Sequence, residues 1–316
     1  MNLVRKRYWL FLFSLLVTIP GLVSLAIPPG LRAGIEFAGG SSLTVEFAQP
    51  VSEGQVRDQV AALGYPEAIV QRLGDSSYFI QTRTLREARL DPLGNVLEPG
   101  ERERLQGALE QNLAPIETAE FASVSPLVAR ETVRNATIAV VAASIAILLY
   151  IAWAFRSLPN PFRYGVCAVI AMLHDVLVVL GLFSILGRFM NIEVNAMFIT
   201  GVLTVVGYSV NDTVVVFDRI RENLTRQVAE DLPATVNVSI LETLGRSLNT
   251  AMTTLFVVVA LLLFGGPSIL VLVLSLLIGI ATGTYSSIAI ASALLVSWES
   301  HDLGRFWRRL RPAPAG

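Results

Sequence analysis

Six long apolar stretches divide the chain. The first runs from Tyr8 to Ile27, directly after Arg5-Lys6-Arg7, and the other five follow a long polar interval, at roughly 133–155, 164–186, 194–217, 247–264 and 268–298. At a helical rise of ~1.5 Å per residue, such stretches are about long enough to cross a ~30 Å hydrocarbon core. The first exceeds the ~7–15-residue core of a signal peptide and meets Pro28-Pro29 at once, so we expect a retained membrane helix. The last is longer than one perpendicular span needs, which predicts a tilt or a break near Gly283.

The polar interval from 28 to 132 has the pattern of a small soluble domain. Alternating apolar residues and short apolar runs between turn residues predict strands, and two amphipathic segments predict helices. The expected elements are a strand within 34–47, a helix at 52–63, strands at 68–73 and 78–82, a helix at 101–113 and a strand at 117–124. This β-α-β-β-α-β order predicts a ferredoxin-like sandwich, with residues 84–100 as an inserted loop.

These patterns predict a polytopic α-helical membrane protein with six transmembrane helices and an external α+β ferredoxin-like domain between helices 1 and 2. The expected bounds are 1–27 for the N-terminus and first helix, 28–132 for the external domain, 133–298 for helices 2 to 6 and 299–316 for a basic tail. Composition agrees, since only 16% of the residues are charged, against about 25% in an average soluble protein.

Charge and cysteine usage exclude several classes of function. A formal net charge of −1 argues against a nucleic-acid partner. The single cysteine, Cys167, allows no intrachain disulfide. The two histidines, His174 and His301, come without a Cys/His cluster, so we expect neither a metal site nor a cofactor.

The basic residues of the short loops predict the orientation. One side of the membrane receives the Arg and Lys residues at 5–7, 156, 163, 219, 221, 226, 246, 305, 308, 309 and 311, and the opposite short loops hold only Arg188. Because Lys and Arg concentrate in cytoplasmic loops, we expect both termini in the cytoplasm and the soluble domain outside.

An acid, Asp212, lies inside the apolar stretch 194–217. An ionised Asp at the centre of a membrane helix costs about 2.5–3.5 kcal/mol on insertion scales, and such acids commonly mark ion or proton paths. Helical spacing places Tyr208, Thr204 and Gly201 on the same face, and Asn211 is adjacent. The alternative is a hydrogen bond that only holds helices together.

Three further features accompany this acid. Arg246 precedes the apolar stretch at 247–264, so we expect it at the start of the fifth helix, either near Asp212 or as a cytoplasmic anchor. Asp175 follows His174 in the third helix, as a weaker proton-path candidate or a packed hydrogen bond. Gly279 and Gly283 form a G-x-x-x-G, and the small residues Ser286, Ser287 and Ala291 extend its face, which predicts close helix packing.

Four motifs together resemble the SecD/SecF family of protein-export membrane proteins. They are Gly34-Ile35-Glu36-Phe37-Ala38-Gly39-Gly40, Leu173-His174-Asp175-Val176, the run from Gly207 to Asn223 that contains Asn211-Asp212-Thr213-Val214, and Gly283-Thr284-Tyr285-Ser286-Ser287-Ile288. The resemblance spans nearly the whole chain. The family commonly has Gly-Ile-Asp-Phe in the first motif, where this chain has Glu36, a swap that keeps the charge.

The resemblance implies a fold similar to half of a resistance-nodulation-division transporter, in the bacterial cytoplasmic membrane. It implies a SecD partner, the SecYEG channel and preprotein substrates, with SecA, YajC and YidC as further candidate partners, in late protein export driven by the proton-motive force. The family's proton-path acid and Arg match Asp212 and Arg246, and another essential acid lies in SecD. Two alternatives remain: a proton-coupled half-transporter of lipid or small molecules, and an intramembrane aspartyl protease using Asp175 and Asp212, although its Gly-x-Gly-Asp and Tyr-Asp patterns are absent.

Overall fold

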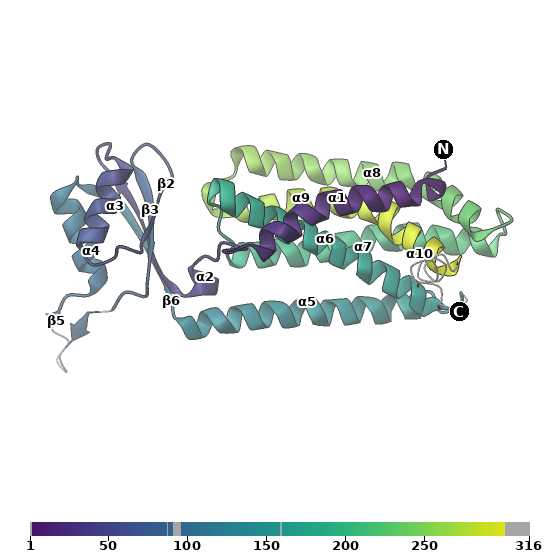
Figure 1. Cartoon of the computed structure of the whole chain (residues 1–316), viewed down its shortest axis with the longest axis horizontal. Coiled ribbons are helices and arrows are strands. Elements are labelled where there is room, and N and C mark those ends of the chain that lie inside the picture. Colours follow the sequence, from purple (N-terminus) through teal and green to yellow (C-terminus); the bar gives the residue numbers. More distant parts are fainter. Residues whose placement is uncertain (1, 87, 91–95, 159, 301–316) are drawn as a thin grey trace, which may run out of the picture. The chain divides into compact units, whose positions relative to one another are not determined.

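The chain forms two compact units. The computed structural model describes residues 2–86, 88–90, 96–158 and 160–300, so nearly all of the tail expected at 299–316 lies outside the described residues. One unit comprises residues 33–136, and the other joins residues 1–32 to the chain from 137 onward. Figure 1 shows the smaller unit as a sheet with helices and the larger one as a helical bundle.

The smaller unit is an antiparallel sheet covered by two helices. Its four-stranded sheet has the order β2-β3-β1-β6, which is the ferredoxin-like order. The elements are α2 (Ile35–Ala38), β1 (Gly40–Phe47), α3 (Glu53–Ala62), β2 (Ile69–Arg72), β3 (Ser77–Thr82), β4 (Arg89–Leu90), β5 (Val96–Glu98), α4 (Glu101–Asn112) and β6 (Ile116–Val124). The segment expected as a loop at 84–100 contains the small β4–β5 hairpin.

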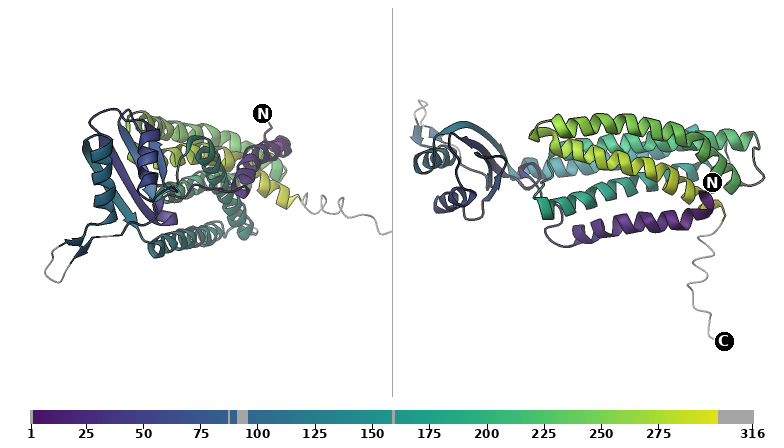
Figure 2. Two further views of the ribbon diagram at one scale, coloured as in Figure 1. Left: turned by 60° about the vertical axis from the view of Figure 1, so that its left-hand side comes forward. Right: turned by 90° about the horizontal axis from the view of Figure 1, so that it is seen from above.

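Alternating apolar residues along β1 contribute to the hydrophobic core of this unit. Leu43, Val45 and Phe47 are buried on one face, and Leu43 pairs with Ile80 of β3. Buried residues of α3 and α4 complete the same cluster, and both helices lie on one face of the sheet (Figure 2). Ser52 starts α3 with a capping box, because its hydroxyl accepts from the Gln55 amide while the Gln55 side chain accepts from the Ser52 amide.

The long helices belong to the larger unit, except that α5 begins within the smaller one. They are α1 (Arg7–Ala26), α5 (Pro126–Ala154), α6 (Pro161–Met190), α7 (Ala196–Thr225), α8 (Leu232–Phe264) and a last helix made of α9 (Leu270–Ser286), a π-helical segment (Ser287–Ala291) and α10 (Ser292–Glu299). Six helices in the described part of the chain are long and apolar enough to span a membrane. The predicted fold class, six membrane helices with a ferredoxin-like domain between the first two, is confirmed.

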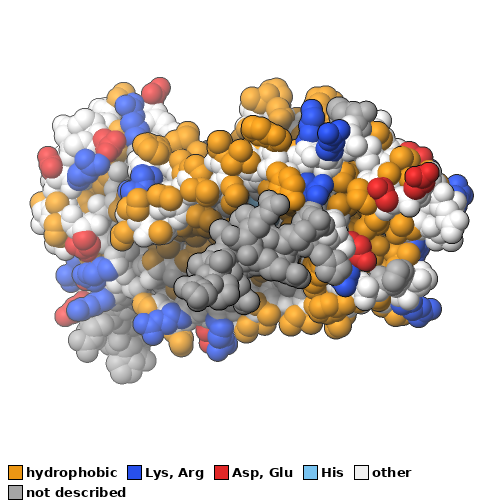
Figure 3. All heavy atoms as spheres, turned by 45° about the vertical axis from the view of Figure 1, so that its right-hand side comes forward, with side chains coloured by type: hydrophobic (Ala, Val, Ile, Leu, Met, Phe, Trp, Pro, Cys, Tyr) orange, Lys and Arg blue, Asp and Glu red, His pale blue; other side chains and the backbone are white. Residues whose placement is uncertain are grey.

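The centre of the bundle lies between α6, α7 and α9. The most apolar segments of these helices are 44–56% buried within the chain, whereas that of α5 is only 6% buried. Glycines allow the closest approaches: a Cβ on Gly21 of α1 would lie 2.7 Å from the Cα of Gly181 on α6. Many hydrophobic side chains remain exposed on the surface seen in Figure 3, as expected for helices that face lipid.

Two helix boundaries differ from the sequence-based expectation. The helix α8 begins at Leu232, so Arg246 lies well inside it and not at its start. Hydropathy located where the membrane span begins, but the helix starts earlier because Val236 and Ile240 are buried and Asn223 of α7 donates to Ser239 at 3.0 Å. The irregularity of the last helix occurs at Ser287–Ala291, one turn beyond Gly283.

Candidate functional site

Asp212 is half-buried in the middle of α7 and faces a small polar cavity. The cavity has a volume of about 130 Å³ and is lined by Tyr208, Asn211, Asp212, Val215, Arg246, Ser247 and Thr250. The structure therefore brings together four residues that the sequence pointed to. Ser247 of α8 donates its hydroxyl to Asp212 Oδ1 at 2.5 Å, and Ser287 donates to Asp212 Oδ2. Bonds of this kind to a charged group contribute about 1.5–3 kcal/mol each, enough to offset much of the insertion cost of the acid.

Arg246 shares the cavity with Asp212 but is not in contact with it. The Arg246 side chain is exposed, and among the described residues no ion pair within 4.0 Å joins it to a carboxylate. Ser247, the next residue along α8, occupies the direct contact with Asp212 instead. Arg246 therefore lines the same cavity as Asp212 without forming an ion pair with it.

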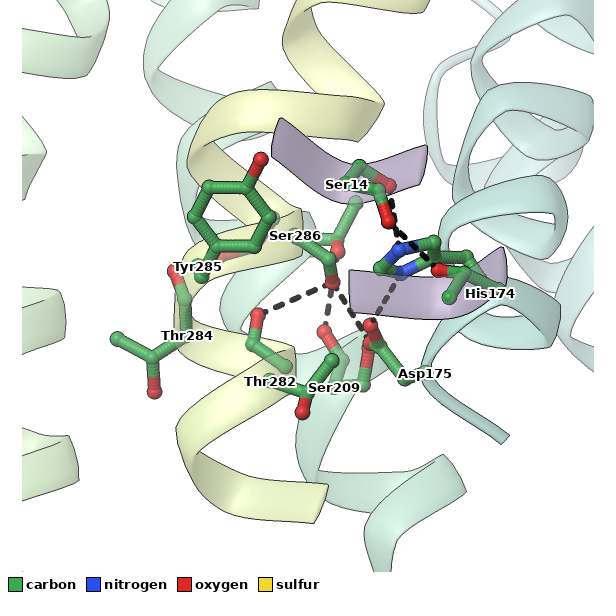
Figure 4. A network of polar contacts seen from close by, with 12 residues as sticks. Ser14, His174, Asp175, Ser209, Thr282, Thr284, Tyr285 and Ser286 are labelled. Atoms are coloured by element: carbon green, nitrogen blue, oxygen red, sulfur yellow. Dashed lines mark hydrogen bonds and ion pairs between the residues drawn. The ribbon is translucent and has the colours of Figure 1, made fainter. Parts of the chain in front are cut away.

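A second carboxyl, Asp175 of α6, is completely buried. Its Oδ2 accepts two hydroxyl hydrogen bonds, from Ser209 of α7 at 2.5 Å and from Ser286 of α9 at 2.6 Å. Its Oδ1 lies 3.0 Å from Nδ1 of His174. This fully hydrogen-bonded carboxyl joins α6, α7 and α9 at the centre of the bundle (Figure 4).

His174 extends the network to α1. Its Nε2 lies 2.6 Å from the Ser14 hydroxyl, and its side chain is 14% exposed. Figure 4 shows the imidazole between Ser14 and Asp175, with each ring nitrogen directed at one of them. The predicted His174–Asp175 pair therefore exists, as one link in a chain of polar contacts.

Ser286 and Ser287 connect the two carboxyls. They are consecutive residues at the junction of α9 and the π-helical segment, and Ser286 donates to Asp175 whereas Ser287 donates to Asp212. π-Helical turns inside α-helices are frequent at functional sites. One helix thus holds both buried acids through neighbouring hydroxyls.

Gly279 and Gly283 lie on the face of α9 that packs against α7. A Cβ on Gly279 would come within 2.1 Å of Val205 Cγ2. A Cβ on Gly283 would lie 3.2 Å from Ser209 Cβ and 3.6 Å from Asp175 Oδ2. Gly283 therefore leaves the space in which Asp175 and Ser209 meet.

Sequence reasoning missed the hydroxyl donors. Ser209, Ser247, Ser286 and Ser287 bind the carboxyls, yet only the last two had been noted, as small packing residues. The spacing of Ser209 and Asp212, three residues apart in one helix, could have indicated a shared polar face. An aspartyl-protease dyad needs two carboxyls that share a proton, and here each acid is instead bound to different serines. Within the described residues, no group of three or more His, Cys, Asp or Glu side chains is arranged to hold a metal.

Comparison with known proteins identifies the family. The model of the protein export membrane protein SecD/SecF C-terminal region matches residues 105–301, and the SecD/SecF GG motif matches residues 25–51. Protein translocase subunit SecF of Thermobaculum terrenum is 48% identical over 315 residues, which cover 99% of each chain. This chain belongs to the SecF family of protein translocase subunits. With its six spanning helices, it is a multi-pass membrane protein of that family.

Other SecF relatives extend the comparison. SecF of Anaerolinea thermophila is 40% identical over 319 residues, which cover all of both chains. The crystal structure of SecDF, a translocon-associated membrane protein from Thermus thermophilus, matches with a TM-score of 0.79 and 31% identity. That match covers 95% of this chain but 39% of the SecDF chain. The fold shared with SecF relatives therefore corresponds to a part of the longer SecDF protein.

Proposed function

We propose that this chain is the SecF-type subunit which, together with a SecD-type partner, uses the proton-motive force to drive late steps of preprotein translocation. In this proposal Asp212 binds the proton, and Asp175, Tyr208 and Asn211 support the path. The observation that carries it is a carboxyl within a spanning helix, held by two serine hydroxyls and open to a polar cavity that Arg246 also lines.

The proton step follows from the charges around that cavity. A nearby cation favours the ionised form of a carboxyl, and its withdrawal favours proton binding. A movement of α8 that brings Arg246 towards Asp212 would displace Ser247 from the acid and release the proton. A proton crossing a 100 mV potential delivers about 2.3 kcal/mol, which shifts a two-state equilibrium about fifty-fold. That energy is similar to the cost of one exposed carboxylate in the membrane, so one proton suffices to bias a two-state bundle.

The partners follow from the family. SecD is the proposed direct partner, because relatives carry a SecF-like region within a longer SecDF chain. The SecYEG channel, SecA, YajC and YidC are further proposed partners. The proposed location of this chain is the bacterial cytoplasmic membrane, with both of its termini in the cytoplasm. The alternative is a proton-coupled half-transporter of lipid or small molecules on the same fold.

The test replaces the two central residues in vesicles that hold the complete export complex. Asp212→Asn is isosteric but cannot titrate, so it should insert and assemble normally while preprotein release no longer accelerates under an imposed proton gradient. Arg246→Met should behave likewise, and the double variant should be no worse than either single one. The matched control is Asp218→Asn, because Asp218 is an exposed acid of the same helix that pairs with Arg221 at 2.5 Å.

Two results would contradict the proposal. A normal response to the gradient in Asp212→Asn would reduce Asp212 to a residue that only holds helices together. Proton-driven movement of lipid without any effect on preprotein release would favour the half-transporter.

A further inference from the structure

His174 lines a groove between α1, α6 and α9 that shares no lining residue with the Asp212 cavity. The groove has a volume of about 380 Å³. His174, Ser14, Thr282 and Tyr285 supply its polar atoms among mainly apolar neighbours such as Phe13 and Val17. Of the described side chains that line it, His174 and Tyr285 are the titratable ones, and the lining residues from α1 (Phe13, Ser14 and Val17) are uncharged.

The imidazole is placed to pass a proton from this groove to the buried acid. One of its nitrogens lies 2.6 Å from Ser14 at the groove, and the other lies 3.0 Å from Asp175 Oδ1. The Tyr285 hydroxyl is directed elsewhere, since it donates to the carbonyl of Leu10 at 2.7 Å. An imidazole can accept a proton at one nitrogen and release one from the other, and its ordinary charge change falls between pH 5 and 8.

We propose that His174 and Asp175 form a second proton-binding unit, which takes up a proton from the groove and exchanges it with Asp212 through Ser286 and Ser287. This inference rests on the proposed function of Asp212. The proton binds at His174 Nε2, and the Nδ1 proton passes to Asp175 Oδ1. Rotation of the protonated carboxyl then presents this proton to the Ser286 oxygen. Ser286 accepts it and passes its own hydroxyl proton to Ser287, which passes its own proton to ionised Asp212.

Ser286 and Ser287 are positioned to carry the proton between Asp175 and Asp212. Each hydroxyl can donate its own proton while accepting another, so no net charge stays on the serines. In this structure Ser286 donates to Asp175 and Ser287 donates to Asp212. A small rearrangement at the π-helical segment that starts at Ser287 is the movement that would join them.

A structural role for His174 makes a different prediction from a relay. If the imidazole only ties α1 to α6, then Ser14→Ala, which removes that tie and leaves the imidazole able to titrate, should have the same effect as His174→Gln. In a relay, His174→Gln fails because its amide forms hydrogen bonds but cannot bind the proton, while Ser14→Ala keeps the pH profile of the wild type.

The experiment uses vesicles with the complete complex and measures preprotein release at a constant pH difference while the absolute pH is stepped from about 5 to about 8. We expect His174→Gln to lose the pH dependence and to slow gradient-driven release at least about a hundredfold, because a positioned proton-transfer group typically contributes about 10²–10⁴-fold. Ser287→Ala should slow gradient-driven release as well. The control is Ser275→Ala, since Ser275 is a buried serine of α9 that donates only to the carbonyl of Val271.

The outcomes separate this inference from the proposed function. A wild-type pH profile in His174→Gln, or the same loss in Ser14→Ala, overturns the relay. If Asp212→Asn has lost the gradient response while His174→Gln keeps the wild-type profile, the proposed function stands and the relay falls. If Asp212→Asn still responds, both fall.

Discussion

The most direct prediction concerns stability when Gly279, at the contact between α7 and α9, is replaced by alanine. An alanine there would place its Cβ 2.1 Å from Cγ2, 2.5 Å from Cγ1 and 2.8 Å from Cβ of Val205. Carbon atoms in favourable contact are about 3.5–4.0 Å apart, so α7 and α9 would have to separate by more than about 1 Å. The contact sits one turn of helix from Gly283 and the carboxyl of Asp175.

The expected change in the free energy of unfolding follows from two opposing effects. Overpacking of this size costs about 1–3 kcal/mol, whereas replacing Gly by Ala in a helix gains about 1 kcal/mol. Gly207→Ala on α7 isolates the second effect, because nothing lies within 4 Å of a Cβ at that position. Gly279→Ala should therefore be about 1–3 kcal/mol less stable than Gly207→Ala. Gly283→Ala should fall between them, since its nearest contact would be 3.2 Å.

The assay is the free energy of unfolding in mixed detergent micelles, followed by circular dichroism. Val205→Ala supplies a second check, because it removes both γ-carbons and leaves only the Cβ contact at 2.8 Å. The double variant Gly279→Ala/Val205→Ala should therefore lose less stability than the two single losses added together. Equal stability of Gly279→Ala and Gly207→Ala would refute the close approach of α7 and α9.

Two further predictions concern orientation and pH. In a Cys167→Ser background, cysteines placed at Ser76 and Gln227 should label from opposite sides of the membrane, and labelling of both by an impermeant reagent outside intact cells would contradict the proposed topology. Burial raises the pKa of Glu193, in the loop between α6 and α7, to about 7. Because the ordinary value is about 4.3, the folded protein should lose stability as pH rises from about 4.5 to about 7. Glu193→Gln should remove this loss in unfolding measured across that range, and an unchanged slope would show that other groups cause it.

The fold could be predicted because its signals are local. The length of an apolar stretch identifies a membrane-spanning helix without knowledge of the helices around it. The alternation of Leu43, Val45 and Phe47 likewise identifies a strand with one buried face. The start of α8 could not be predicted from hydropathy, because it depends on tertiary contacts. The first turns of α8 are polar in part, and a hydrogen bond from Asn223 of α7 to Ser239 holds them. Hydropathy indicates which residues lie in the membrane. A helix can extend beyond them as long as its backbone is hydrogen-bonded and one of its faces packs against other elements.

The site was predictable only where charge made a residue conspicuous. Asp212 and Asp175 stand out in an apolar background, because an acid there needs a compensating partner. The partner itself could not be deduced, since the sequence offered the cation Arg246 as one candidate while the structure supplies the hydroxyls of Ser247 and Ser287. Serine is common in membrane helices as a small packing residue, so its role as a donor appears only when the helices are in register. Under the proposed function, hydroxyl partners in place of a direct cation leave Asp212 able to change its protonation state. In the proposed mechanism, Ser247 and Ser287 hold Asp212 while Arg246 stays apart from it, and an approach of Arg246 would displace Ser247 and favour the ionised acid.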